Sequence, residues 1–211
     1  VIEFAPMWKE VKRVLKHKGA FITTSNQPFA SALIMSNPSW FKYEWIWIKT
    51  KASNHVNSHL RPMGKHENIL VFSGGTIANH SPNQMMYFPQ GLKEVNITNF
   101  RPSPRFGGYQ GKRPSHKKTL FQKYTGYPTT DLYFPNPNNK LIHPTQKPVA
   151  LYEYLIKTYT NEGETILDIA MGSGTTIEAA ERTGRNSIGI EKDEGIFQSA
   201  VLRLKSFTPS N

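Results

Sequence analysis

The sequence has no cysteine, and its acidic residues are few. The absence of cysteine excludes a disulfide scaffold, a thiolate metal site and a cysteine nucleophile within these residues. No apolar run is long enough to cross a membrane, and the first residues do not have the pattern of a signal peptide, so a cytoplasmic protein is expected. Asp and Glu number 15 against 26 Lys and Arg, which leaves a net charge of +11. This imbalance predicts a polyanionic partner.

The positive charge is concentrated between residues 93 and 123, where Glu94 is the single acid and aromatic residues are interleaved with the cations. Cations that neutralise phosphates, beside aromatic rings that pack on bases or sugars, are typical of nucleic-acid binding. A solvated surface loop is the alternative, because the segment is also rich in Pro and Gly. The predicted DNA-binding residues are Arg101, Arg105, Lys112, Arg113, Lys117, Lys118 and Lys123.

The length of 211 residues suits one domain, or one domain with a long insertion. Hydrophobic periodicity predicts a helix within residues 3–17, a strand at 20–24, a helix at 29–35, and a strand at 41–49 with an antiparallel partner at 68–73. Trp45 and Trp47 share one face of their strand and are expected in the core. Periodicity is lost from 76 to 141, which predicts three regions: core residues 1–75, a basic insertion at 76–141 and a second core part at 142–211.

The stretch from Asp168 to Thr176 follows an apolar strand at 165–167 and opens a helix at 177–182, and a second strand runs from 186 to 190. Gly172 and Gly174 allow a close approach to a ligand, and the free N–H groups of the helix start favour an anion. Glu191 ends the second strand, where an acid can accept hydrogen bonds from ribose hydroxyls. A glycine-rich turn without a ligand is the alternative, because this motif alone is weakly specific.

The residues around these glycines disfavour a phosphate ligand. Ile177 stands where a dinucleotide-binding turn has Gly or Ala, and no Lys-Ser/Thr pair ends the turn as in a phosphate-binding loop. A ligand with a carboxylate and a ribose fits better, and S-adenosylmethionine has both. The lack of cysteine then argues against methyl transfer to cytosine C5, which requires a thiolate.

The run His143-Pro144-Thr145-Gln146-Lys147-Pro148, a helix and then Asp168 to Thr176 resemble the DNA amino-methyltransferases of the β arrangement. Upstream, the segments 8–15, 25–29, 41–47 and 66–72 are similar to the same family in the same order. Adenine-N6 enzymes of the phage, prophage or restriction-modification type are the nearest in pattern. The resemblance implies an α/β fold with a Rossmann-like S-adenosylmethionine-dependent methyltransferase sheet and an antiparallel hairpin.

The same resemblance implies methylation of adenine N6 in double-stranded DNA, with S-adenosylmethionine as cofactor. The implied cofactor-binding residues are Asp168, Met171, Gly172, Ser173, Gly174, Thr175, Thr176 and Glu191, with Thr145, Gln146 and Lys147. Ser25, Gln27 and Phe29 follow a strand whose end should face the crevice, and they are the candidates for contact with the target base. No metal site is expected, because His55, His59 and His66 lack acidic or thiolate partners.

The catalytic Asp-Pro-Pro-Tyr signature of the family does not occur in this sequence. Asn37-Pro38-Ser39-Trp40 imitates it, but the position between a helix and a strand predicts a turn. The catalytic residues are therefore expected upstream of Val1, on a strand lying between the strands at 20–24 and 166–168, supplied by the same protein, a dimer partner or a second subunit. Three alternatives remain open: a non-catalytic DNA-binding subunit, a cytosine-N4 enzyme and an RNA methyltransferase.

Overall fold

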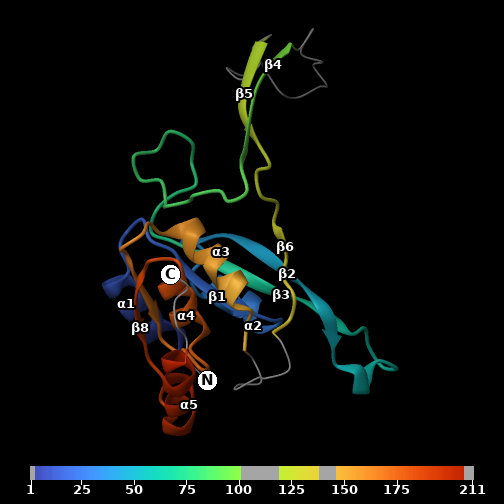
Figure 1. Ribbon diagram of the computed structural model, residues 1–211, viewed down its shortest axis with the longest axis vertical. Helices are drawn as coiled ribbons and strands as arrows, with labels where there is room; N and C mark the ends of the chain where they lie inside the picture. The colour runs from blue at the N-terminus through green and yellow to red at the C-terminus, as the bar shows by residue number, and fades with distance from the viewer. Residues whose placement is uncertain (1–2, 101–118, 138–145, 207–211) are drawn as a thin grey trace. The chain divides into compact units, whose positions relative to one another are not determined.

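The computed structural model describes residues 3–100, 119–137 and 146–206 (Figure 1). The chain divides into two compact units, the first formed by Val1–Phe88 with Thr129–Asn211 and the second by Pro89–Pro128. The second unit covers fewer residues than the predicted insertion at 76–141. Residues just before it belong to the first unit, because Met86 N donates to Lys18 O at 2.9 Å and Phe88 N donates to Thr158 O at 2.7 Å.

The main sheet of the first unit has four strands in the order β1-β3-β2-β6. Strand β3 pairs antiparallel with β1 on one side and with β2 on the other, and β6 pairs parallel with β2. The antiparallel pairing of β2 with β3 confirms the predicted hairpin. The strands are β1 (Phe21–Ser25), β2 (Phe41–Ser53), β3 (Gly64–Phe72) and β6 (Asp131–Tyr133), with a short 3-10 turn, η1 (His55–Asn57), between β2 and β3.

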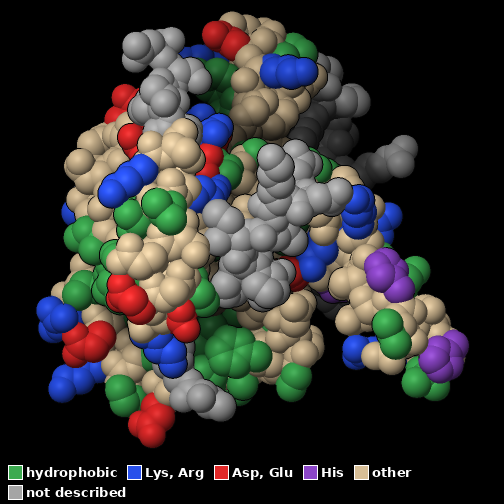
Figure 2. Space-filling model, turned by 60° about the horizontal axis from the view of Figure 1, so that its bottom comes forward, with side chains coloured by type: hydrophobic (Ala, Val, Ile, Leu, Met, Phe, Trp, Pro, Cys, Tyr) green, Lys and Arg blue, Asp and Glu red, His purple; other side chains and the backbone are tan. Residues whose placement is uncertain are grey.

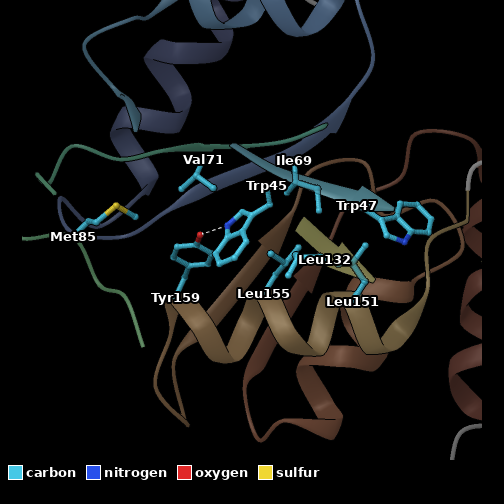
Figure 3. Packing of buried hydrophobic residues seen from close by; sticks show 9 residues of the cluster. All are labelled: Trp45, Trp47, Ile69, Val71, Met85, Leu132, Leu151, Leu155 and Tyr159. Atoms are coloured by element: carbon cyan, nitrogen blue, oxygen red, sulfur yellow. Dashed lines mark hydrogen bonds between the residues drawn. The ribbon is translucent and has the colours of Figure 1, made fainter. Parts of the chain in front are cut away.

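Both faces of this sheet are covered, as the alternation of side chains along β3 shows. Leu70 and Phe72 pack against α1 (Phe4–Val14) and α2 (Phe29–Ser36) in one cluster of buried residues. Ile69 and Val71 belong to a second cluster, which includes residues of α3 (Val149–Tyr159) (Figure 3). The side chains of these four consecutive residues, 69–72, are all fully buried, which explains why this part of β3 is a continuous apolar run.

Trp45 and Trp47 lie in the cluster under α3, so their prediction as core residues is confirmed. The indole of Trp45 donates a hydrogen bond of 2.6 Å to the hydroxyl of Tyr159, and Trp47 donates one of 2.8 Å to Phe134 O. Each buried indole N–H therefore has an acceptor, which a buried tryptophan requires. The bond between Trp45 and Tyr159 fixes the end of α3 on the sheet (Figure 3).

A second, two-stranded parallel sheet consists of β7 (Thr165–Asp168) and β8 (Asn186–Gly189), joined by helix α4 (Thr175–Arg182). Ile156 of α3 packs with Ala179 and Ala180 of α4, so α3 is shared between the two sheets. The chain then continues into α5 (Glu194–Lys205), a helix that the sequence analysis did not predict. Among the described residues, β1 is paired only with β3 and β7 only with β8.

The second unit contains an antiparallel pair, β4 (Lys93–Phe100) and β5 (Thr119–Thr125), in which Lys93 faces Thr125. Although hydrophobic periodicity is lost over residues 76–141 of the sequence, the structure has regular strands there, namely β4, β5 and β6. Their polar residues hide the period of two that marks a half-buried strand. None of the helices described is long and apolar enough to cross a membrane.

Candidate cofactor site

The turn between β7 and α4 is held to β8 by backbone hydrogen bonds. Ile190 N donates to Asp168 O at 2.8 Å, and Met171 N donates to Ile190 O at 2.9 Å. The carboxylate of Asp168 accepts a bond from Ala170 N at 3.0 Å, which fixes the first residues of the turn. Asp168 thus stands at the carboxyl end of a parallel strand, the edge where ligands bind in open α/β sheets.

Glu191 is joined directly to the glycine turn. Its Oε2 accepts a hydrogen bond from Gly172 N at 3.0 Å, and its Oε1 accepts one from Asp193 N at 3.1 Å. The bond from Asp193 N is the largest cause that lowers the pKa of Glu191, and the bond from Gly172 N acts in the same direction. Both stabilise the carboxylate form. An ionised acceptor therefore lies at the turn, with lone pairs left for further donors.

The turn offers backbone groups and few side chains. Gly172 and Gly174 have positive φ angles of +50° and +76°, which favour glycine. The hydroxyls of Ser173 and Thr175 lie 3.2 Å apart and are buried, and Met171 and Thr176 are buried too. In the part of the chain that the structure describes, the N–H groups of Thr175, Thr176 and Ile177 have no acceptor. The start of α4 can therefore bind an anion through its backbone.

An ion-pair network supports this turn from the side of α4 and α5. Arg203 donates to the carbonyl of Ser173 at 2.6 Å and also pairs with Glu178. Glu178 in turn pairs with Arg182 at 2.6 Å. The sequence analysis missed this network. The spacing of Glu178 and Arg182 on one helix face could have indicated their pair, whereas the contact with Arg203 depends on how α5 packs.

Lys147, a predicted ligand for a cofactor carboxylate, lies beside a buried acid. Its ammonium is 3.0 Å from Oε2 of Glu67, and the ammonium of Lys49 is 2.5 Å from Oε1. Burial raises the pKa of Glu67, but the hydrogen bonds and charges of Lys49 and Lys147 outweigh it, so that the net pKa is lowered. Sequence reasoning missed Glu67 and Lys49, because only the pairing of β2 with β3 brings them to the start of α3.

Tyr152 connects this cluster with the end of β7. Burial raises the pKa of its phenol, and the negative charges of Asp168 and Glu67 raise it further, whereas a hydrogen bond with Thr24 lowers it. Tyr152 therefore lies near β1, β3 and β7 at once. The Lys49–Glu67–Lys147 cluster and the carboxylate of Asp168 consequently belong to the same region of the first unit.

The three candidates for base contact differ in their surroundings. Ser25 is buried at the end of β1, and its hydroxyl has no hydrogen-bond partner among the described residues. The side-chain oxygen of Gln27 accepts bonds from Ser31 N at 3.3 Å and from its hydroxyl at 2.7 Å. Phe29 is 43% exposed, and its ring centroid is 5.8 Å from that of Phe4. Of the three, Ser25 has the uncommitted polar group.

Several predicted residues lie outside the described part of the chain: Thr145, Arg101, Arg105, Lys112, Arg113, Lys117 and Lys118. Lys123 is described in β5, with its ammonium 5.1 Å from the ring centroid of Tyr124. Gln146 is half-buried. Asn37 begins the turn predicted there, since its carbonyl accepts from Trp40 N at 3.2 Å. Within the described residues, no three His, Asp or Glu side chains converge to hold a metal ion.

The sheets, the helices around them and the turn after β7 define an α/β fold of the methyltransferase class. The structure titled M1.HpyAVI-SAM complex superposes with a TM-score of 0.61 at 24% identity, covering 92% of this chain and 78% of the other. The PvuII DNA methyltransferase, described as cytosine-N4-specific, superposes with a TM-score of 0.64 at 16% identity, covering 99% and 70%. These likenesses confirm the predicted fold.

A family model described as DNA methylase matches residues 3–202, and the chain belongs to this family. The type II methyltransferase M.HpaI of Haemophilus parainfluenzae is 26% identical over 210 residues, which are 97% of this chain and 60% of that protein. The chain thus spans little more than half the length of this relative. M.HindIII of Haemophilus influenzae is 28% identical over 96% of this chain and 68% of its own length.

Proposed function

We propose that the protein transfers the methyl group of S-adenosylmethionine to an exocyclic amine in double-stranded DNA, with adenine N6 as its target. The observation that carries this proposal is the hydrogen bond of 3.0 Å between Glu191 and Gly172 N, in a chain of the DNA methylase family. It joins an ionised acceptor for ribose hydroxyls to a glycine turn with free backbone N–H groups.

The residues at this turn suit the proposed cofactor. Glu191 would accept the ribose hydroxyls, and Asp168 together with the start of α4 would hold the amino-acid end. The ammonium of Lys147 pairs with Glu67, and because an ammonium has three N–H donors, it can also bind the carboxylate of the cofactor. Gln146 and Thr145 precede it and would complete this side of the site. The cofactor supplies an electrophilic methyl group on a sulfonium, so the protein has only to bind and orient both reactants.

The amine of adenine is a poor nucleophile, because its lone pair is delocalised into the ring. Its hydrogens need acceptors, which the resemblance assigns to an Asp-Pro-Pro-Tyr segment. We propose that this segment lies along the edges of β1 and β7 that have no paired strand among the described residues. Ser25 ends β1 and would contact the target base, which has to leave the duplex stack to react. Gln27 and Phe29 follow it and would line the same pocket.

The reaction is tested with the purified full-length protein, including any residues that precede Val1, together with duplex DNA and S-adenosylmethionine carrying a labelled methyl group. After digestion to nucleosides, we expect the label in N6-methyladenine. Label in N4-methylcytosine would instead support the cytosine-N4 alternative, the activity named for the PvuII enzyme whose fold this chain shares. DNA binding without any label transfer would support a non-catalytic subunit. Labelled RNA under the same conditions would support an RNA methyltransferase.

The cofactor site is tested separately by calorimetry. Removal of the carboxylate in Asp168→Ala should abolish measurable binding of S-adenosylmethionine. Glu191→Gln should weaken binding by about 10- to 100-fold, since hydrogen bonds to a charged group contribute about 1.5–3 kcal/mol. Glu194→Gln removes an exposed carboxylate nearby and should leave the affinity unchanged. Wild-type affinity in Asp168→Ala and Glu191→Gln would refute this site.

M.HpaI and M.HindIII are named type II methyltransferases. We therefore propose that the protein recognises a specific DNA sequence in the cytoplasm, as part of a restriction-modification system. Contact with DNA is assigned to the basic segment of residues 101–123, and a dimer partner or second subunit would complete the sheet if the protein itself does not.

A further inference from the structure

We propose that Glu67 and Lys49 are positioning residues for the cofactor, because they hold the ammonium of Lys147 in place to bind the carboxylate of S-adenosylmethionine. We call Lys49, Glu67 and Lys147 the charge cluster. Glu67 and Lys49 act on the cofactor through Lys147. This inference rests on the proposed function and deepens it, since it names two residues of β2 and β3 on which the affinity for the cofactor depends.

The charge cluster is shielded from water. Many charged side chains of the protein stand at its surface, as the red and blue groups in Figure 2 show. The side chains of Lys49, Glu67 and Lys147 are only 13%, 11% and 15% exposed. The ammonium of Lys49 also lies 5.3 Å from the ring centroid of Trp47, which is buried. Charges in such surroundings are costly unless they are paired.

The charge cluster contains two lysines and one glutamate, and so it carries one net positive charge. The two ammonium groups share the carboxylate of Glu67, one at each oxygen. All 15 Asp and Glu residues lie in the described ranges, and the ion pairs found there give neither lysine a second carboxylate. A shielded charge that is not balanced favours an ionic ligand of opposite sign. The carboxylate of the cofactor would make the cluster neutral.

Strand pairing brings the charge cluster to the side of the sheet that α3 covers. Glu67 pairs with Trp47 across β3 and β2, and Lys49 is two residues beyond Trp47. Because side chains alternate along a strand, all three project to the same face. Trp47 packs there with residues of α3. Lys147 comes two residues before the first residue of α3, so it meets Glu67 at the start of this helix.

The amino-acid end of the cofactor has two opposite charges, and the site offers a group for each. Tyr152, in the first turn of α3, is close enough to Asp168 and Glu67 for both charges to act on its phenol. The positive charge cluster and the carboxylate of Asp168 therefore lie near the same side chain. Lys147 would bind the carboxylate of the cofactor, and Asp168 would bind its amino group.

A lysine binds a single ligand better when its ammonium is already fixed. The four-carbon stem of lysine is flexible, and ordering it on binding reduces the affinity. The contact of 3.0 Å with Glu67 orders Lys147 before the cofactor arrives. Lys49, at 2.5 Å from the other oxygen, prevents Glu67 from neutralising Lys147 alone. The affinity for a carboxylate should therefore depend on both residues.

The first test compares two ligands by calorimetry on the full-length protein. One is S-adenosylmethionine, and the other is decarboxylated S-adenosylmethionine, which lacks the carboxylate. The wild type should bind the decarboxylated ligand about 10- to 100-fold more weakly, because it loses hydrogen bonds to a charged group. Glu67→Gln should bind S-adenosylmethionine about 10-fold more weakly and keep the wild-type affinity for the decarboxylated ligand. A general loss of structure would weaken the binding of both ligands.

The second test applies the same pair of ligands to Lys49→Gln. Glu67 then neutralises Lys147 alone, so this variant should also lose affinity for S-adenosylmethionine and keep it for the decarboxylated ligand. The control is Glu164→Gln, which removes a carboxylate that pairs with Lys16 at 2.7 Å. Glu164 precedes β7, at the opposite end of the strand from Asp168. This control should bind both ligands like the wild type.

Three outcomes would overturn the inference while the proposed function stands. Equal binding of both ligands by the wild type would show that the charge cluster does not bind the carboxylate. Variants that weaken both ligands alike, or neither, would show that Glu67 and Lys49 only stabilise the fold. Tighter binding of S-adenosylmethionine by Glu67→Gln would show that Glu67 competes with the cofactor for Lys147. A wild-type protein that binds no S-adenosylmethionine would refute the proposed function as well.

Discussion

At the scale of single residues, Glu67 is a buried acid held between two lysines. Its carboxylate lies 2.5 Å from Lys49 and 3.0 Å from Lys147, and each of the three side chains is at most 15% exposed. A carboxylate in such surroundings is stable because both partners are in place. Loss of its charge leaves two half-buried ammonium groups facing each other.

The variant Glu67→Gln should lower the free energy of unfolding at neutral pH. The pKa of Glu67 is lowered in the folded protein from its ordinary 4.5, so its stabilising effect is complete above that value and is lost as the pH falls through the folded pKa. The difference between variant and wild type should therefore shrink on acidification below about 4.5. Urea unfolding over a pH series measures it. Glu10→Gln, at an exposed ion pair, serves as control, and a difference that does not change with pH would contradict the expectation.

At the scale of elements, the start of α4 depends on a left-handed residue. Gly174 has a φ of +76°, and a Cβ there would lie 3.1 Å from Leu204 of α5. Gly163, before β7, has nearly the same φ of +77° with no neighbour within 4 Å of a Cβ. The two glycines thus share the backbone requirement, while only Gly174 is also restricted by packing.

We expect Gly163→Ala to cost about 1–2 kcal/mol from backbone strain alone. Gly174→Ala should cost more, because Leu204 has to move, and it should also weaken S-adenosylmethionine binding by shifting the start of α4. Thermal unfolding and calorimetry on both variants measure the two effects. Equal losses of stability and an unchanged cofactor affinity in Gly174→Ala would show that the helix start tolerates the shift.

At the scale of the whole molecule, the net charge of +11 is shared between the two units. Lys117 and Lys118, both outside the described residues, belong to the basic segment predicted to bind DNA. Lys117→Ala with Lys118→Ala should weaken DNA binding and lower its salt slope by about 2. Binding isotherms at several salt concentrations measure this, and Lys9→Ala with Lys18→Ala provides the matched loss of charge. A wild-type slope would remove these lysines from the contact surface.

Local patterns in the sequence determined the β7–α4 turn, the amphipathic helix α1, the core strands β1 to β3 and the family resemblance, because each depends on the spacing of neighbouring residues. The site residues proposed from these patterns remain predictions for the experiments above. Only the tertiary structure decided that Glu67 holds Lys147, that Arg203 supports Ser173, and that Met171, Ser173 and Thr175 turn inward. These contacts join residues far apart in the chain, and strand pairing and helix packing, which no local spacing encodes, bring them together.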